Sequence, residues 1–213
     1  MVKTVLVSFD EGKVSPLIPE QSFMPVWHPD GDELAVVYGE WRMADLPLNW
    51  DIGNFTIDRK GQVKEALTPL VTRYHQDLGI SWAPDKPWMV YQSNRSKDPV
   101  MFYDGPGNHN GIFLKTAFDE QEISLTEKYR ECWKPEFSPD GRRIFFGASA
   151  IDTFDMKPRI IHLNDQGLVE EVRELPRDGI GGHVWMGTWT PDGKQLLLEV
   201  SDGASGKAIW IMD

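Results

Sequence analysis

The chain has 213 residues, and its 22 Lys and Arg against 33 Asp and Glu give a formal net charge of −11. With 40% hydrophobic and 11% aromatic residues, it has the composition and the length of a soluble protein that can bury a core. No run of about eighteen apolar residues occurs, so we predict no membrane insertion. The acidic balance argues against nucleic-acid binding through phosphates. Cys132 is the sole cysteine, which excludes an intrachain disulfide.

The chain begins with a short β-branched run. Residues 4–9 carry this pattern and no small-residue cleavage site follows, so we predict a strand here rather than a signal peptide. Gly12 marks a turn after it, and a second strand that contains Leu17 is expected to follow. In the repeat that is described next, these two strands correspond to the third and fourth strands.

A turn motif recurs four times along the chain. The copies are Trp27-His28-Pro29-Asp30-Gly31, Trp82-Ala83-Pro84-Asp85-Lys86, Phe137-Ser138-Pro139-Asp140-Gly141 and Trp189-Thr190-Pro191-Asp192-Gly193. Successive prolines are 55, 55 and 52 residues apart. Pro presets φ, Asp bonds the backbone two residues on, and Gly accepts positive φ, so the motif predicts a tight turn between two strands.

The strand after each motif is apolar on both faces. The apolar residues at the fifth and seventh positions past the proline are Leu34, Met89, Ile144, Leu196, Val36, Tyr91, Phe146 and Leu198. This pattern is typical of a strand in a small sheet packed between two others. Two further strands complete each repeat, and in the second repeat residues 112–114 compete with 100–103 for the third strand. Four short strands per period of about fifty residues are typical of a propeller blade.

These features together resemble the repeats of TolB-type, WD-like β-propellers over nearly the whole chain. The resemblance also includes Ile-Trp-Ile-Met-Asp at 209–213 and Leu-Thr at 67–68 and 125–126. It implies an all-β propeller with about four four-stranded blades, in one partial domain spanning 1–213. We expect blades near 1–20 (half), 21–70, 71–127, 128–177 and 178–213 (incomplete). Because TolB-like propellers usually have six or more blades, part of a six- to eight-bladed propeller is expected over a closed four-bladed ring.

One face of such a propeller carries long, unequal loops, which are the usual place for recognition. The loops expected at 39–52 and 93–110 supply the candidate ligand-binding residues Trp41, Arg42, Trp50, Phe102 and Tyr103. A third loop, expected at 147–157, holds Phe154 and Asp155. Aromatic rings beside charges suit stacking on sugars or anchoring a peptide. The alternative is that these rings cover the blades beneath them.

A second candidate site precedes the innermost strands, six or seven positions before each motif aromatic. It contains His75, Arg130, Glu131 and His183, which we expect at the mouth of the central channel on the same face. Histidines, carboxylates and an arginine could hold a metal or an anionic ligand there. The alternative is that they bond the connections between blades.

No catalytic motif of a serine hydrolase, zinc peptidase or P-loop enzyme occurs in the chain. The resemblance therefore implies a non-catalytic module that binds a protein or peptide and needs no cofactor beyond a metal at the channel mouth. It also implies a bacterial cell-envelope protein, periplasmic or secreted.

Similar repeats leave two enzyme alternatives and a carbohydrate-binding propeller open. One is the gating propeller of a prolyl-oligopeptidase-like serine peptidase, whose hydrolase domain is separate. The other is a metal-dependent polysaccharide lyase of the oligogalacturonate lyase kind. The lyases carry a His-Pro-His run before the motif aromatic, where this chain has Cys132-Trp133-Lys134-Pro135-Glu136.

Overall fold

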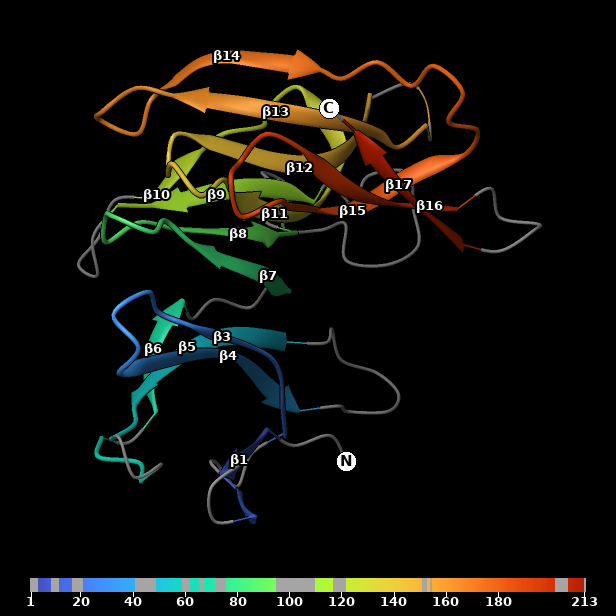
Figure 1. Cartoon of the computed structure of the whole chain (residues 1–213). Coiled ribbons are helices and arrows are strands. Elements are labelled where there is room, and N and C mark those ends of the chain that lie inside the picture. The colour runs from blue at the N-terminus through green and yellow to red at the C-terminus, as the bar shows by residue number, and fades with distance from the viewer. Residues whose placement is uncertain are drawn as a thin grey trace. The chain divides into compact units, whose positions relative to one another are not determined.

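The computed structural model describes residues 4–8, 12–16, 21–40, 49–58, 62–65, 67–71, 76–94, 110–116, 122–150, 153, 155–201 and 207–212. The chain divides into two compact units, Met1–Leu78 and Gly79–Asp213. Within the described ranges every regular element is a β-strand (Figure 1). Those ranges contain no helix with the length and hydropathy needed to cross a membrane.

Seventeen strands form five sheets in the described ranges, and consecutive strands are neighbours in each. The first sheet pairs β1 (Val5–Ser8) with β2 (Lys13–Pro16). The second contains β3 (Gln21–Trp27), β4 (Glu33–Glu40), β5 (Asn49–Thr56) and β6 (Thr68–Val71). The third contains β7 (Asp77–Trp82), β8 (Met89–Ser93), β9 (Gly111–Lys115) and β10 (Glu122–Ser124). The fourth contains β11 (Tyr129–Phe137), β12 (Arg143–Ala150), β13 (Lys157–Leu163) and β14 (Val169–Glu174). The C-terminal sheet contains β15 (His183–Trp189), β16 (Leu196–Ser201) and β17 (Lys207–Met212).

The predicted all-β architecture of four-stranded sheets is confirmed. The described strands begin with a pair, continue through three four-stranded sheets and end with a three-stranded one. In the second repeat the third strand is β9, which includes residues 112–114 as predicted. The competing residues 100–103 lie outside the described ranges.

The turn aspartates make the predicted bonds to the backbone two residues on, since Asp140 Oδ1 accepts from the Arg142 N–H at 3.0 Å and Asp192 Oδ1 from the Lys194 N–H at 3.1 Å. The Ser138 hydroxyl donates to Asp140 Oδ1 at 2.6 Å and accepts from the Arg143 N–H at 3.1 Å. Thr190 and Asp192 repeat the first of these bonds at 2.6 Å in the last motif. Gly141 and Gly193 take φ values of 66° and 67°, which a residue with a Cβ rarely adopts. The motif is therefore a self-contained polar turn that closes the first and second strands of each sheet.

Successive turns also lie against one another in the Gly79–Asp213 unit. The Cβ position of Gly141 lies 2.5 Å from Asp85 Oδ1 of the preceding turn, so the two turns are in close contact. The Arg143 guanidinium bonds Asp140 Oδ2 at 2.8 Å and the Gly193 carbonyl of the next turn at 3.0 Å. The turn ends of these sheets are therefore held close together.

The turn carboxylate gives a test by pH. Burial raises the pKa of Asp140, but the hydrogen bonds from Ser138, the Arg142 N–H and Arg143 outweigh it and leave the pKa below its usual value. A depressed pKa stabilises the fold above the unfolded value of about 3.9 and loses that effect as pH falls through the folded value. We expect Asp140→Asn to lower the free energy of unfolding at pH 7 by at most about 1 kcal/mol, since the carboxylate is half exposed. The difference from the wild type should shrink below about pH 4 in urea titrations. If the difference in the free energy of unfolding between the two proteins stayed constant down to about pH 2, this account would be contradicted.

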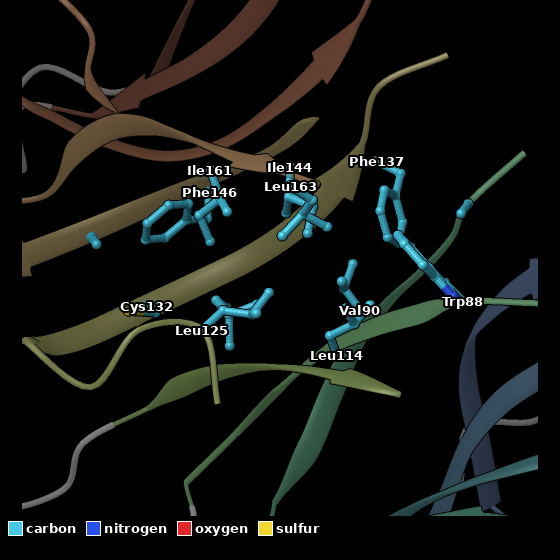
Figure 2. Packing of buried hydrophobic residues seen from close by; sticks show 13 residues of the cluster. Trp88, Val90, Leu114, Leu125, Cys132, Phe137, Ile144, Phe146, Ile161 and Leu163 are labelled. Atoms are coloured by element: carbon cyan, nitrogen blue, oxygen red, sulfur yellow. The ribbon is translucent and has the colours of Figure 1, made fainter. Parts of the chain in front are cut away.

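The core between the third and fourth sheets comes from the apolar second strands and their neighbours. Figure 2 shows Trp88, Val90 and Leu114 of one sheet facing Phe137, Ile144 and Phe146 of the next. Cys132 lies in the same cluster and is fully buried. Burial of such side chains contributes about 1.5–3 kcal/mol each, so this contact is a main source of stability in the unit.

Candidate functional site

The first strands β11 and β15 are tied at their beginnings to the preceding sheet. In the Gly79–Asp213 unit, Glu131 Oε2 accepts a hydrogen bond from Asn110 Nδ2 at 2.9 Å. The Cys132 N–H donates to the Asn110 carbonyl at 2.8 Å, next to a parallel bridge between Asn110 and Glu131. Asn110 directly precedes β9, so Glu131 joins the start of β11 to the start of a third strand.

His183 occupies the same repeat position as Glu131, six residues before the motif aromatic. Its Nδ1 accepts from the Met156 N–H at 3.2 Å, and the Val184 N–H donates to the Met156 carbonyl at 2.9 Å. A neutral imidazole that accepts at Nδ1 carries its hydrogen on Nε2. Nε2 is therefore a donor in that state, while Nδ1 is committed to the framework.

The connection that leads into β15 is fixed by a bidentate ion pair. Arg177 Nη1 and Nη2 lie 2.9 and 2.8 Å from the two carboxylate oxygens of Asp155, and Nη1 also bonds the Gly182 carbonyl at 2.9 Å. Asp155 Oδ1 is 3.9 Å from His183 Nδ1. Planar guanidinium–carboxylate pairs fix geometry as well as charge, so this pair positions the start of β15.

Two tryptophans lie beside these polar groups. Trp133 of β11 and Trp185 of β15 both stand four residues before their motif aromatic, and their rings meet edge to face at 5.8 Å. The His183 ring lies 6.1 Å from that of Trp185, and all three residues are half-buried. We call Trp133, Trp185 and His183 the aromatic cluster. It places two indoles and an imidazole from adjacent sheets together at a partly open surface.

Both first strands of the aromatic cluster carry a bulge beside their tryptophan, after Trp133 in β11 and at Trp185 in β15. The extra residue of β11 lies between Trp133 and Glu136, and Lys134 has a φ of 46°. Met24 and Gly79 hold the equivalent place in their repeats, with φ values of 50° and 63°. Pro25 and Pro135 follow two of these residues, and proline cannot donate to the sheet ladder. Bulges redirect side chains, and left-handed non-glycine residues are more frequent at binding sites than elsewhere.

The structure places only some of the residues that the sequence singles out. Glu131 and His183 lie at first-strand starts, where both bond the preceding sheet as the structural alternative expects. Arg130 lies in β11. His75, Trp41, Arg42, Phe102 and Tyr103 lie outside the described residues.

The placement of Trp50 in a loop is wrong. Trp50 belongs to β5, pairs with Gly39 of β4, and is only 4% exposed. Its ring meets Phe23 edge to face at 4.8 Å. The hairpin strands extend further than their polar sequence suggests, so the indole packs within its sheet instead of reaching outward.

The described residues contain no group of three or more His, Cys, Asp or Glu side chains placed to hold a metal. Burial raises the pKa of the Cys132 thiol to about 12, so this thiol is neutral at physiological pH. Reactive thiolate chemistry is therefore excluded for Cys132.

Arg177 and the two tryptophans of the aromatic cluster are absent from the predicted site residues, whereas Asp155 falls in the recognition loop predicted at 147–157. The tryptophans carried a usable signal, because both stand at one position of the repeat. Arg177 pairs with Asp155, 22 residues away, and nothing in the repeat pattern marks these two residues as partners.

No family model and no curated protein matches the sequence. Among solved structures, TolB from Acinetobacter baumannii matches with a TM-score of 0.69 and 16% identity over 98% of this chain and 45% of its own. A puromycin-hydrolyzing peptidase from Mycobacterium tuberculosis matches with a TM-score of 0.68 and 14% identity, over 99% of this chain and 33% of its own. An oligogalacturonate lyase in complex with manganese matches with a TM-score of 0.66 and 11% identity, over 99% and 56%.

The chain thus spans about half or less of the length of these structures. At such identities the likeness concerns the fold, and one fold serves many functions. Together with the meander sheets and the repeated turn, it shows that this chain has the TolB-like β-propeller fold.

Proposed function

We propose that this chain is a non-catalytic propeller module that binds a protein or peptide on the face where its first strands begin. The observation that carries the proposal is the aromatic cluster at that end of β11 and β15. Indole rings supply large contact areas at low entropic cost and dominate many peptide interfaces. As part of the same proposal, the module works in the bacterial cell envelope, as the likeness to TolB suggests.

The framework around the cluster supports binding without a large rearrangement. His183 is held by the Met156 N–H, and the connection before it is held by the Arg177–Asp155 pair. Glu131 is held in the same way by Asn110 on the adjacent sheet. A pre-organised site loses less conformational entropy when it binds, which favours recognition of an extended peptide.

A peptide library tests this proposal. We expect a random peptide phage library to yield binders of the wild-type protein, and their affinity to fall at least about tenfold in Trp133→Ala/Trp185→Ala, since buried aromatic anchors are worth 2 kcal/mol or more. Affinity is measured by isothermal titration calorimetry on synthetic copies of the selected peptides.

Trp27→Ala is the matched control, because Trp27 is an exposed indole at the other end of its first strand. Circular dichroism of the double variant checks that the fold persists. Equal peptide affinity in wild type and folded double variant would remove the aromatic cluster from the proposal. Tryptophan quenching by a panel of oligosaccharides, with no peptide selected, would point instead to the carbohydrate alternative.

A further inference from the structure

His183 is the member of the aromatic cluster whose side-chain type can gain a proton near neutral pH. Histidine as a residue type changes its charge between about pH 5 and 8, whereas an indole stays neutral. The His183 ring lies 6.1 Å from the Trp185 ring, at an interplanar angle of 64°. A movement of the imidazole therefore changes the surface that the aromatic cluster offers to a peptide.

The hydrogen bond that holds this ring exists only in the neutral state of the ring. Nδ1 of His183 accepts from the Met156 N–H at 3.2 Å, and a protonated Nδ1 would itself be a donor. Met156 is fully buried, and its carbonyl accepts from the Val184 N–H at 2.9 Å, so its backbone is held in place. When Nδ1 gains a proton, the imidazole must move away from the Met156 N–H.

An acceptor for the protonated ring stands beside it. Asp155 Oδ1 lies 3.9 Å from His183 Nδ1, which is too long for a hydrogen bond in the neutral state. The Asp155 carboxylate is held by Arg177 through contacts of 2.9 and 2.8 Å, so its position is fixed. A donor at Nδ1 is attracted to this carboxylate, and the ring has a second arrangement available to it.

Four strands pack beside β15 and bring further groups near its start. These groups are Gly147 of β12, Ser201 and Glu199 of β16, Lys157 of β13 and Glu131 of β11. Glu199 pairs across the sheet with Met186, three residues along β15 from His183. Lys157 donates to Glu174 at 2.7 Å, and Glu131 accepts from Asn110 at 2.9 Å. Asp155 is therefore the carboxylate that the described part of the chain places against Nδ1.

We infer that protonation of His183 moves its ring from Met156 towards Asp155 and that peptide binding to the aromatic cluster weakens as the pH falls. The effect on binding rests on the proposed function, whereas the movement of the ring does not. The bond to Met156 is present when the ring is neutral and is lost when the ring gains its proton, which fixes the sign. Protonation of a histidine is a local charge change that can bias an element with two arrangements.

The Met156 amide tests the movement of the ring without any peptide. In amide NMR spectra of the full chain, we expect the Met156 signal to shift between about pH 8 and pH 5, because its N–H loses an acceptor. The Val184 signal should change much less, since its bond to the Met156 carbonyl is kept. In His183→Asn the side-chain oxygen can accept at every pH, so the Met156 signal should stay constant. His162→Asn, towards the other end of β13, is the matched control and should titrate like the wild type.

Peptide affinity tests the consequence of that movement. Calorimetry with selected peptides that lack histidine should show binding to the wild type at least about fivefold weaker at about pH 5.5 than at about pH 7.5, the effect of one hydrogen bond. His162→Asn should behave like the wild type, and His183→Asn should change less than about twofold.

The two measurements separate this inference from the proposed function. A Met156 signal that does not shift with pH would overturn the inference. Equal pH dependence of peptide affinity in the wild type and in His183→Asn would also overturn it. If no peptide is selected at all, the proposed function fails and the effect on binding fails with it, while the Met156 signal still decides whether the ring moves.

Discussion

Gly147→Ala is expected to lower the free energy of unfolding by about 3 kcal/mol, the upper part of the range for overpacking a close-packed site. A Cβ on Gly147 of β12 would lie 2.5 Å from the Val184 carbonyl oxygen and 3.0 Å from that of Trp185. Both atoms belong to the backbone of β15, so relief requires moving a strand of the C-terminal sheet. The measurement is equilibrium unfolding in urea followed by tryptophan fluorescence.

Gly181→Ala is the matched control for this substitution. No atom lies within 4 Å of the Cβ position at Gly181, and its φ lies outside the left-handed region. The control should change stability by less than about 0.5 kcal/mol. If both variants unfold at the wild-type urea concentration, the close approach of β12 and β15 is not part of the native structure.

Much of the fold could be predicted because the chain repeats it. The spacing of 55, 55 and 52 residues between prolines fixes where each first strand ends and each second strand begins. Local chemistry then decides the turn, as the bonds from the Arg142 and Lys194 N–H groups to the turn aspartates confirm. The same periodicity also predicted that β1 and β2 correspond to the third and fourth strands of a repeat and that the last repeat, which contains β17, is incomplete.

The site was less predictable because it depends on residues that the repeat does not specify. Trp50 looks like a loop aromatic, yet eight-residue strands β4 and β5 extend far enough to include it. Glu131 and His183 were identified by position, but their partners Asn110 and Met156 lie 21 and 27 residues away. Which backbone groups they bond depends on sheet-to-sheet packing, and no local pattern encodes that.

The irregularity in the first strand is related to both the local sequence and the position in the repeat. Pro25 and Pro135 remove a ladder donor, which favours a bulge next to them, but Gly79 has the same left-handed conformation without a following proline. The left-handed residue therefore recurs at one repeat position in three first strands, with or without proline, whereas the register shift of β15 lies one residue earlier, at Trp185. Its consequence is that Trp133 and Glu136 stand on opposite sides of an irregularity, one in the aromatic cluster and one bonded to Trp189.

Phe137→Ala should be strongly destabilising because the motif aromatic joins one sheet to the one before it. Phe137 is 6% exposed and packs among side chains of both sheets, so its removal leaves a cavity that neither sheet can fill alone (Figure 2). Truncation of buried phenylalanine typically costs about 3–5 kcal/mol, the sum of lost transfer energy and cavity formation. The backbone bond from the Phe137 N–H to Ser81 survives the change, so the loss measures the ring.

Trp27→Ala removes a larger ring from the same repeat position and provides the comparison. Because Trp27 is half exposed within the chain, we expect a loss of less than about 1 kcal/mol in dilute, monomeric protein. Phe137 and Trp27 lie at the same position of their strands and precede the same turn. The difference between the two losses in free energy of unfolding therefore reports whether a neighbouring sheet covers the aromatic ring. Equal losses, measured by urea unfolding at the same low protein concentration, would contradict the view that the exposed Trp27 ring contributes little to stability.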